Sequence, residues 1–267
     1  NALQVICAII FFVCFTIYVA SAYVAGASVF TAIFPSLSSH AAMIIFALAM
    51  LLITFFGGFK AVCWTDFFQG ILMFAALMTV PIVIAITKDM DPAALSVVYS
   101  YKDAVSGEMV ECSFGTGLFD ASWQDIISGL AWGLGYFGMP HILVRFMSIE
   151  KPSMVKKSAT VAIIWVICAL GCACLIAYFG RMFLAEELLT AGAQKMVFID
   201  FARKLFPSFI AGILMAAIIA ASMSTADSQL LVASSSFTSD IYKPIIRKDA
   251  DEKEILWVGR IIVVIVA

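Results

Sequence analysis

Charged residues are scarce in this sequence. Only 13% of its 267 residues are Asp, Glu, Lys or Arg, none of these precedes Lys60, and 63% of the residues are hydrophobic. Soluble domains average about 25% charged residues, because a surface that faces water has to be covered by polar groups. A water-soluble globule and a disordered chain are therefore excluded, and most of the length is expected to face lipid.

Paired cysteines and an excess of basic residues are also missing. The seven cysteines are scattered, most of them within apolar runs, and none has the C-x-x-C spacing of zinc or redox sites. We therefore expect small helix residues and no disulfide framework. With 16 basic and 18 acidic residues, nothing indicates a basic surface for nucleic acid.

Long apolar segments are what the sequence has instead. Most of them approach or exceed the roughly 17 residues that a helix needs to cross a bilayer. They lack the alternation of lipid-facing barrel strands, and a helix satisfies its own backbone in lipid. The predicted fold class is all-α, a polytopic membrane helix bundle. The segments are 5–30, 41–56, 62–87, 125–145, 158–183, 208–239 and a last one from residue 255.

The ends and the loops suggest how the chain is organised. Residues 1–267 are expected to be a fragment of a single transmembrane domain, because no charged leader precedes the first apolar run and the last run is cut short. Loop lysines and arginines favour a cytoplasmic start. The acidic insert 88–123 then lies outside, the loops at Lys60, 145–157 and 243–253 lie inside, and the outer loop 181–204 is expected to form a short interfacial helix.

A dense polar patch interrupts the sixth segment at 220–229. At 3.6 residues per turn, one helix face carries Ala221, Ser224, Thr225 and Ser228. Asp227 lies on the flank of this stripe. Hydroxyls and a backbone carbonyl suit a small hard cation such as Na⁺, which needs oxygen ligands to replace its water. The alternative is that these hydroxyls bond back to the helix or join neighbouring helices.

The fourth segment is weakened at 132–141, where three glycines and Pro140 occur within nine residues. A break or kink is predicted there, and transporters use such discontinuous helices to bind substrate at the midplane. Trp132, Tyr136 and Pro140 share one face and predict a pocket, with ordinary packing as the alternative. The G-x-G-x-x-G match from Gly133 follows no strand, so it does not indicate a dinucleotide site.

Asp66 lies about one turn inside the cytoplasmic boundary of the third segment. Two interpretations stay open. A carboxylate is favourable at the start of a helix, and a carboxylate at membrane depth often faces an ion pathway.

Taken together, these stretches resemble the sodium/solute symporter family, and within it the bacterial sodium/proline symporters. The similarity runs in order along nearly the whole chain. The strings that carry it are 15–21, 57–66, 132–141, 145–147, 223–225, 239–243 and 256–260. The resemblance implies a leucine-transporter-like inverted repeat of five plus five helices, of which this chain holds the fourth to the tenth family helix in part.

The resemblance also implies two kinds of site. The main sodium site falls on the Ala221 carbonyl and the Ser224 and Thr225 hydroxyls. A second sodium site, known in some relatives, would use Asp66 and Ser228 with Ser224, and Asp227 is a further candidate there. The substrate pocket maps to Tyr18, Trp132, Tyr136 and Pro140.

Two departures from the family pattern bear on these assignments. Met139 stands where proline carriers of the family have Gln, beside the expected substrate cavity. Asp227 and Ser228 replace a Ser-Cys pair, which would add a carboxylate near the ions or turn one toward a neighbouring helix.

The expected function is sodium-coupled import of a small amino acid, with proline as the first candidate, across the cytoplasmic membrane. No covalent chemistry is expected, so the chain is not predicted to be an enzyme. The alternative is the transporter-like sensor portion of a membrane histidine kinase. A channel is disfavoured, because no pore loop or ring of charges is present.

Overall fold

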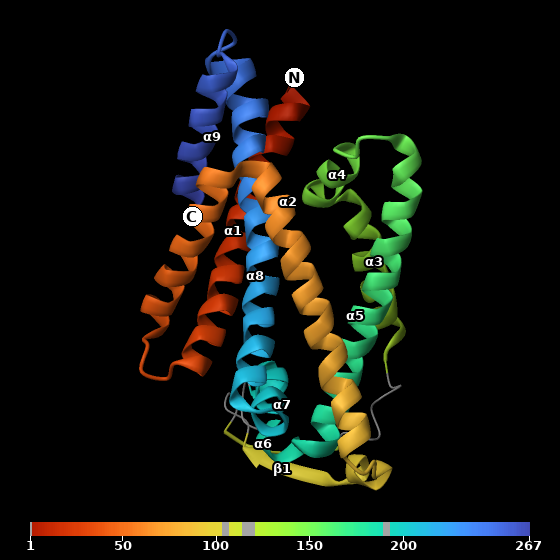
Figure 1. Cartoon of the computed structure of the whole chain (residues 1–267). Coiled ribbons are helices and arrows are strands. Elements are labelled where there is room, and N and C mark those ends of the chain that lie inside the picture. The colour runs from red at the N-terminus through yellow and green to blue at the C-terminus, as the bar shows by residue number, and fades with distance from the viewer. Residues whose placement is uncertain (1, 103–106, 114–120, 189–192) are drawn as a thin grey trace. The chain divides into compact units, whose positions relative to one another are not determined.

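The structure is a computed structural model that describes residues 2–102, 107–113, 121–188 and 193–267. It is dominated by helices (Figure 1), as the all-α prediction requires. The principal ones are α1 (Ala2–Ile33), α2 (Ser39–Thr87), α3 (Trp123–Gly135), α4 (Pro140–Met147), α5 (Val155–Phe183), α8 (Ser208–Phe237) and α9 (Glu252–Val266). Five helical stretches of this described chain are long and apolar enough to cross a membrane: Leu3–Ile33, Ser39–Thr87, Trp123–Met147, Pro152–Phe183 and Ser208–Ile246.

Helix α2 joins two of the predicted segments across a sharp bend at Gly58 (Figure 1). A straight helix of its 49 residues would be about 74 Å long, more than twice the roughly 30 Å hydrocarbon core. Gly58 has φ 57° and ψ −163°, a conformation open mainly to glycine. No atom lies within 4 Å of the position a Cβ would take, so the backbone alone requires glycine there.

The predicted break in the fourth segment is confirmed. Helix α3 ends at Gly135, a single 3₁₀ turn η2 (Tyr136–Gly138) follows, and α4 starts at Pro140. Met139 between them is extended, with φ −68° and ψ 118°, as the residue before a proline usually is. Proline suits the first position of α4 because the N–H that it lacks would have no helical partner there.

The chain divides into two compact units, and α2 and α8 contribute to both. The first unit comprises residues 1–73 and 216–267. Its core is built from apolar faces of four helices, among them Phe15, Val19, Tyr23, Phe46, Met50, Ala226, Leu230, Ala233, Ile262 and Val266. Helices α1 and α2 approach closely at Gly26, where a Cβ would lie 2.7 Å from the Phe46 ring.

The second unit comprises residues 74–215. Helix α5 packs on the end of α2, with the Phe74 and Trp165 ring centroids 6.2 Å apart. The predicted helical structure in 181–204 is present as α6 (Ala185–Leu188), η4 (Ala193–Met196) and α7 (Val197–Leu205). An ion pair between Glu187 and Lys204 joins α6 to α7, and α7 buries Ile199, Phe201 and Ala202.

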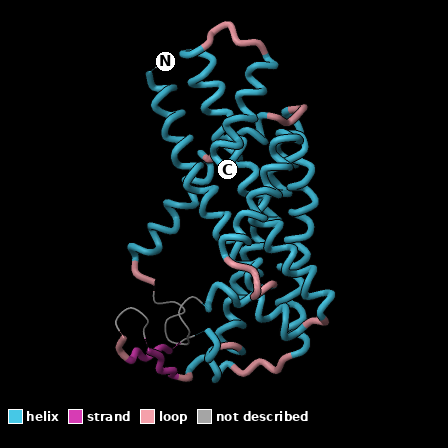
Figure 2. The backbone as a smooth tube through the Cα atoms, turned by 90° about the vertical axis from the view of Figure 1, so that its left-hand side faces the viewer, coloured by secondary structure: helices cyan, strands magenta, loops and turns pink. Residues whose placement is uncertain are grey.

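The acidic insert contains a hairpin that the sequence analysis did not anticipate. After the short 3₁₀ helix η1 (Pro92–Ser96), β1 (Val98–Lys102) pairs antiparallel with β2 (Met109–Ser113) (Figure 2). Strand β1 contains one valine and two tyrosines and β2 one valine, residues that favour strands, but both strands are short and lie within a polar insert. The sixth segment likewise continues past α8 as the π-helix η5 (Thr238–Ile246) before α9 begins.

Candidate functional site

The polar stripe of α8 is continuous in the first unit. The Ser224 and Thr225 hydroxyls donate to the Ala221 carbonyl, at 3.1 and 3.2 Å. The Ser228 hydroxyl lies 2.9 Å from the Ser224 carbonyl. Each such bond uses the one hydrogen of a hydroxyl and leaves the lone pairs of its oxygen available. The stripe therefore presents the oxygen atoms that a cation requires.

Asp66 and Ser228 lie together, as the hypothesis of a second sodium site requires. Asp66 is half-buried in the second limb of α2, after the Gly58 bend. Its Oδ2 is 3.4 Å from the Ser228 hydroxyl oxygen on α8, a spacing longer than an ordinary hydrogen bond. Ser224 is one turn away from Ser228 on α8. A carboxylate and two hydroxyls are thus grouped in this unit.

Asp227 points to a different partner. Its side chain is fully buried, and its Oδ1 accepts a 2.6 Å hydrogen bond from the Thr54 hydroxyl of the first α2 limb. Its Oδ2 has no hydrogen-bond partner among the described residues. Of the two alternatives for Asp227, a place near the ions or contact with a neighbouring helix, this bond to α2 is the second. Thr54 could not be predicted as its partner, because one hydroxyl in an apolar helix carries no signal of its own. The buried Tyr23 hydroxyl and Gln229 Oε1 likewise have no partner in the described part of the chain.

The four expected substrate residues fall in separate units. Trp132 and Tyr136 lie before and within the break that ends α3, and both side chains are exposed, Trp132 by 66%. Pro140 is half-buried at the start of α4. Tyr18 belongs to α1 in the first unit and is also exposed. Three of the four thus flank one helix break, and a pocket made from all four stays a prediction.

The family of the chain follows from a comparison of its sequence with known protein families. Residues 1–267 match the sodium:solute symporter family along their whole length. The chain belongs to the sodium:solute symporter family. This confirms the resemblance drawn from the motifs. A symporter family is one of transporters and not of enzymes.

Individual symporters show how far the likeness extends. The chain is 40% identical to the sodium/proline symporter of Escherichia coli (strain K12), over 99% of this chain and 52% of that protein. It is 38% identical to the high-affinity proline transporter PutP of Bacillus subtilis (strain 168), over 99% of this chain and 54% of that one. The chain thus spans about half the length of the curated relatives it matches.

A solved symporter structure shares the fold. It is the substrate-bound, outward-open state of a Na⁺-coupled sialic acid symporter, matched with a TM-score of 0.67 at 20% identity. The match covers 99% of this chain and 56% of that one. The expectation of a leucine-transporter-like membrane bundle is confirmed.

Proposed function

We propose that this chain is part of a sodium-coupled symporter of the cytoplasmic membrane that imports a small amino acid, with proline as the first candidate. The observation that carries the proposal is the hydroxyl stripe of α8, where Ser224 and Thr225 meet on the Ala221 carbonyl. Hydroxyls at membrane depth bond back to their own helix, join a partner helix or bind an ion. The similarity to sodium/proline symporters favours ion binding over a purely structural role for these hydroxyls.

The coupling between ion and substrate follows from linkage. Na⁺ bound at Ser224 and Thr225 stabilises the conformation that accepts substrate, and so raises the affinity for the amino acid. Substrate must then tighten Na⁺ binding by the same factor. A membrane potential adds about 2.3 kcal/mol per charge for each 100 mV, about fifty-fold in accumulation.

The helix break supplies the candidate substrate site. Trp132 and Tyr136 are exposed beside it, and the interruption leaves backbone groups outside regular helix bonding. With Pro140 they are the proposed amino-acid-binding residues, and the family resemblance adds Tyr18 to them. Met139 stands beside them, where proline carriers have Gln, so the substrate assay should include other small amino acids. Nothing in the described residues favours the sensor alternative.

Uptake measurements test the proposal directly. The full-length protein is reconstituted in vesicles, and labelled proline uptake is followed with an inward Na⁺ gradient and with K⁺ in its place. Uptake that requires Na⁺ is expected. Equal uptake in K⁺ would overturn sodium coupling. Na⁺-driven uptake of another small amino acid without proline would replace the substrate and keep the coupling.

A single substitution tests the sodium site. Thr225→Val is nearly isosteric but removes one oxygen ligand, and a loss of about 1.4 kcal/mol would raise the Na⁺ concentration for half-maximal uptake about tenfold. The matched control is Thr160→Val in α5, because the exposed Thr160 hydroxyl also bonds only to its own helix, at Lys156. Unchanged Na⁺ dependence in Thr225→Val would favour the interpretation that these hydroxyls merely join helices.

A further inference from the structure

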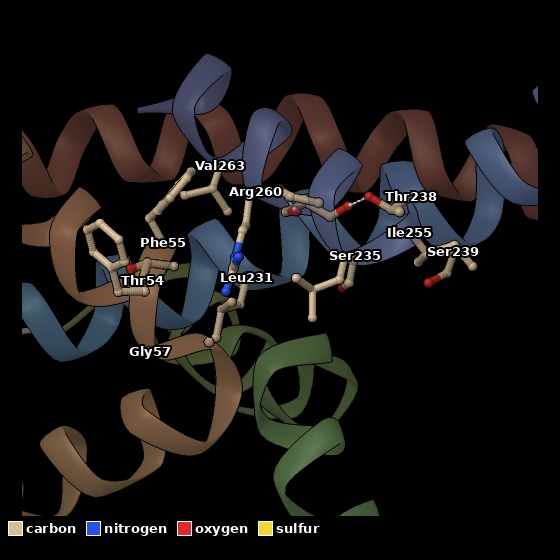
Figure 3. Close-up of a pocket in the computed structure, with 15 residues that line it drawn as sticks. Thr54, Phe55, Gly57, Leu231, Ser235, Thr238, Ser239, Ile255, Arg260 and Val263 are labelled. Carbon is tan, nitrogen blue, oxygen red and sulfur yellow. Dashed lines mark hydrogen bonds between the residues drawn. The ribbon is translucent and has the colours of Figure 1, made fainter. Parts of the chain in front are cut away.

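A cavity of about 310 Å³ lies in the first unit, away from the hydroxyl stripe. Its walls come from the residues around the α2 bend, the last turns of α8 with the start of η5, and the first turns of α9 (Figure 3). The α8 and α9 walls are tied together where the Ser234 hydroxyl donates to the Gly259 carbonyl at 2.7 Å. This bond holds the α8 and α9 walls against each other.

Arg260 is the only charged residue among those that line the cavity. Its side chain extends from α9 toward Leu231 and Gly57 (Figure 3). Its guanidinium carbon is 5.5 Å from the Phe55 ring centroid and 5.1 Å from that of Trp257. Such stacking on aromatic faces holds the planar group in one orientation and leaves its edge, where the N–H donors lie, free to bind.

No hydrogen bond or ion pair is formed by the Arg260 guanidinium with any described residue. Three acids near the cavity are engaged elsewhere, among them Asp251, which accepts from the Glu254 N–H. Glu254 accepts from Tyr242 and pairs with Arg247, and Asp240 accepts from Gln4. A guanidinium has five donors and no way to lose its charge, so an anion is the ligand that fits this cavity.

Most hydroxyls in the wall already donate to other groups of the chain. Ser235 donates to the Val232 carbonyl and Thr238 to the Ser234 carbonyl. Their hydrogens are therefore used within the helix, which leaves the five N–H donors of Arg260 and the hydroxyl of Ser239 as wall donors for an anion. A guanidinium can bind two oxygens of a carboxylate or a phosphate at once, which is among the strongest hydrogen-bonding arrangements open to it.

The position of the cavity indicates where the phosphate comes from. In the predicted topology, the α2 bend, the end of η5 and the start of α9 all face the cytoplasm, close to Lys60, Lys243 and Lys253. Phe56 and Leu256, which also line the cavity, are largely exposed. Apolar groups beside the half-buried Arg260 suit an amphiphile with an anionic head and acyl chains. Basic pockets on the cytoplasmic side of membrane proteins bind anionic headgroups.

We propose that this cavity binds the headgroup phosphate of an anionic phospholipid from the cytoplasmic leaflet, with Arg260 as its principal ligand. The acyl chains then lie along Phe56 and Leu256. None of the residues proposed for the sodium or amino-acid sites lines this cavity, and the proposal does not depend on which solute is carried. Free phosphate has the same anionic group but no acyl chains that could contact Phe56 and Leu256.

Thermal stability of the purified full-length protein tests the proposal. The thermal midpoint is measured in detergent with phosphatidylglycerol, with phosphatidylcholine and with inorganic phosphate. An upward shift with phosphatidylglycerol alone is expected. It should be lost in Arg260→Gln and kept in Arg247→Gln, which removes the same charge from the exposed loop where Arg247 pairs with Glu254.

Three outcomes overturn the proposal. They are an equal phosphatidylglycerol shift in Arg260→Gln, an equal loss of the shift in Arg247→Gln, and a shift of the same size with inorganic phosphate, which would assign a free anion. If Arg260→Gln does not yield folded protein, Arg260→Lys decides, because it keeps the charge and loses the bidentate fork. A clearly smaller shift supports the site, and a shift equal to the wild type overturns it.

Discussion

The hydrogen bond between Thr54 and Asp227 gives a quantitative test of how α8 is held in the first unit. It joins two fully or nearly fully buried side chains, 173 positions apart in the sequence, at 2.6 Å. Thr54→Val removes the donor with almost no change in volume. The effect on unfolding free energy is therefore that of the hydrogen bond and not that of a cavity.

The expected magnitude follows from the surroundings of the carboxyl group. Hydrogen bonds between membrane helices average about 0.6 kcal/mol and reach about 1.7 kcal/mol, and bonds to charged groups contribute about 1.5–3 kcal/mol. Thr54 is the one hydrogen-bond partner of the Asp227 carboxyl among the described residues. We therefore expect Thr54→Val to destabilise the protein by about 1–2 kcal/mol.

A double-mutant cycle isolates this interaction. Unfolding free energies are measured by denaturing-detergent titration for the wild type, Thr54→Val, Asp227→Leu and the double variant. Thr54→Val should cost about 1–2 kcal/mol in the wild type and close to nothing once Asp227 is gone. The control is Thr79→Val in the same helix, because the Thr79 hydroxyl bonds only to Ala75 one turn earlier.

Additive effects of Thr54→Val and Asp227→Leu on the unfolding free energy would contradict this prediction. If Thr54→Val costs the same in both backgrounds, the two side chains do not interact in the folded protein. If Thr79→Val costs as much as Thr54→Val, loss of any hydroxyl from α2 destabilises the helix, and the pairing with Asp227 has no special weight.

Two further predictions concern helix packing and pH. Gly26→Ala should destabilise the protein by about 1–3 kcal/mol in the same titration, because the new methyl group meets the buried Phe46 ring. Gly70→Ala, in open space, should be neutral or stabilising. Burial, and next the Glu187 carboxylate, raise the pKa of Asp200 in α7. The folded state then holds the Asp200 proton more tightly than the unfolded state does. The stability of the protein should therefore fall as pH rises from about 3.9 through the pKa of the folded state. In Asp200→Asn the thermal midpoint should fall less over this pH range.

These two predictions fail in distinct ways. A Gly26→Ala protein as stable as the wild type would mean that the Phe46 ring moves aside without loss of packing. A thermal midpoint whose pH profile is the same in Asp200→Asn and in the wild type would mean that Asp200 titrates alike in the folded and unfolded chain.

The helix breaks could be predicted from the sequence because their causes are local. The residue pair Gly57 and Gly58 and the cluster that ends at Pro140 act on the backbone within a few residues. The two bends therefore fall where the glycines and the proline stand. The stripe of Ser224, Thr225 and Ser228 could also be predicted from the sequence, because helical spacing alone brings these residues onto one face.

The features that could not be predicted from the sequence all depend on contacts between distant segments of the chain. The hairpin of β1 and β2 requires two short strands to find each other across a loop, and neither strand has a pattern strong enough to stand out. The partner of Asp227 could not be identified, because an isolated threonine such as Thr54 is common in membrane helices. Arg260 was recognised only within a family motif, and its cavity appears only when α2, α8 and α9 are assembled.

The geometry of α8 explains why its hydroxyl stripe can serve as a preformed site. Successive helix residues are about 100° apart, so Ser228 and Asp227 point in clearly different directions. Asp227 is fixed by Thr54, and Ala226 and Leu230 are buried in the core of the first unit. Any rotation that turned Ser228 away from Asp66 would break the Thr54 bond and withdraw these apolar residues from the core. The orientation of the stripe is therefore set by packing, and at the proposed sodium site the oxygen ligands would already be in place before an ion binds.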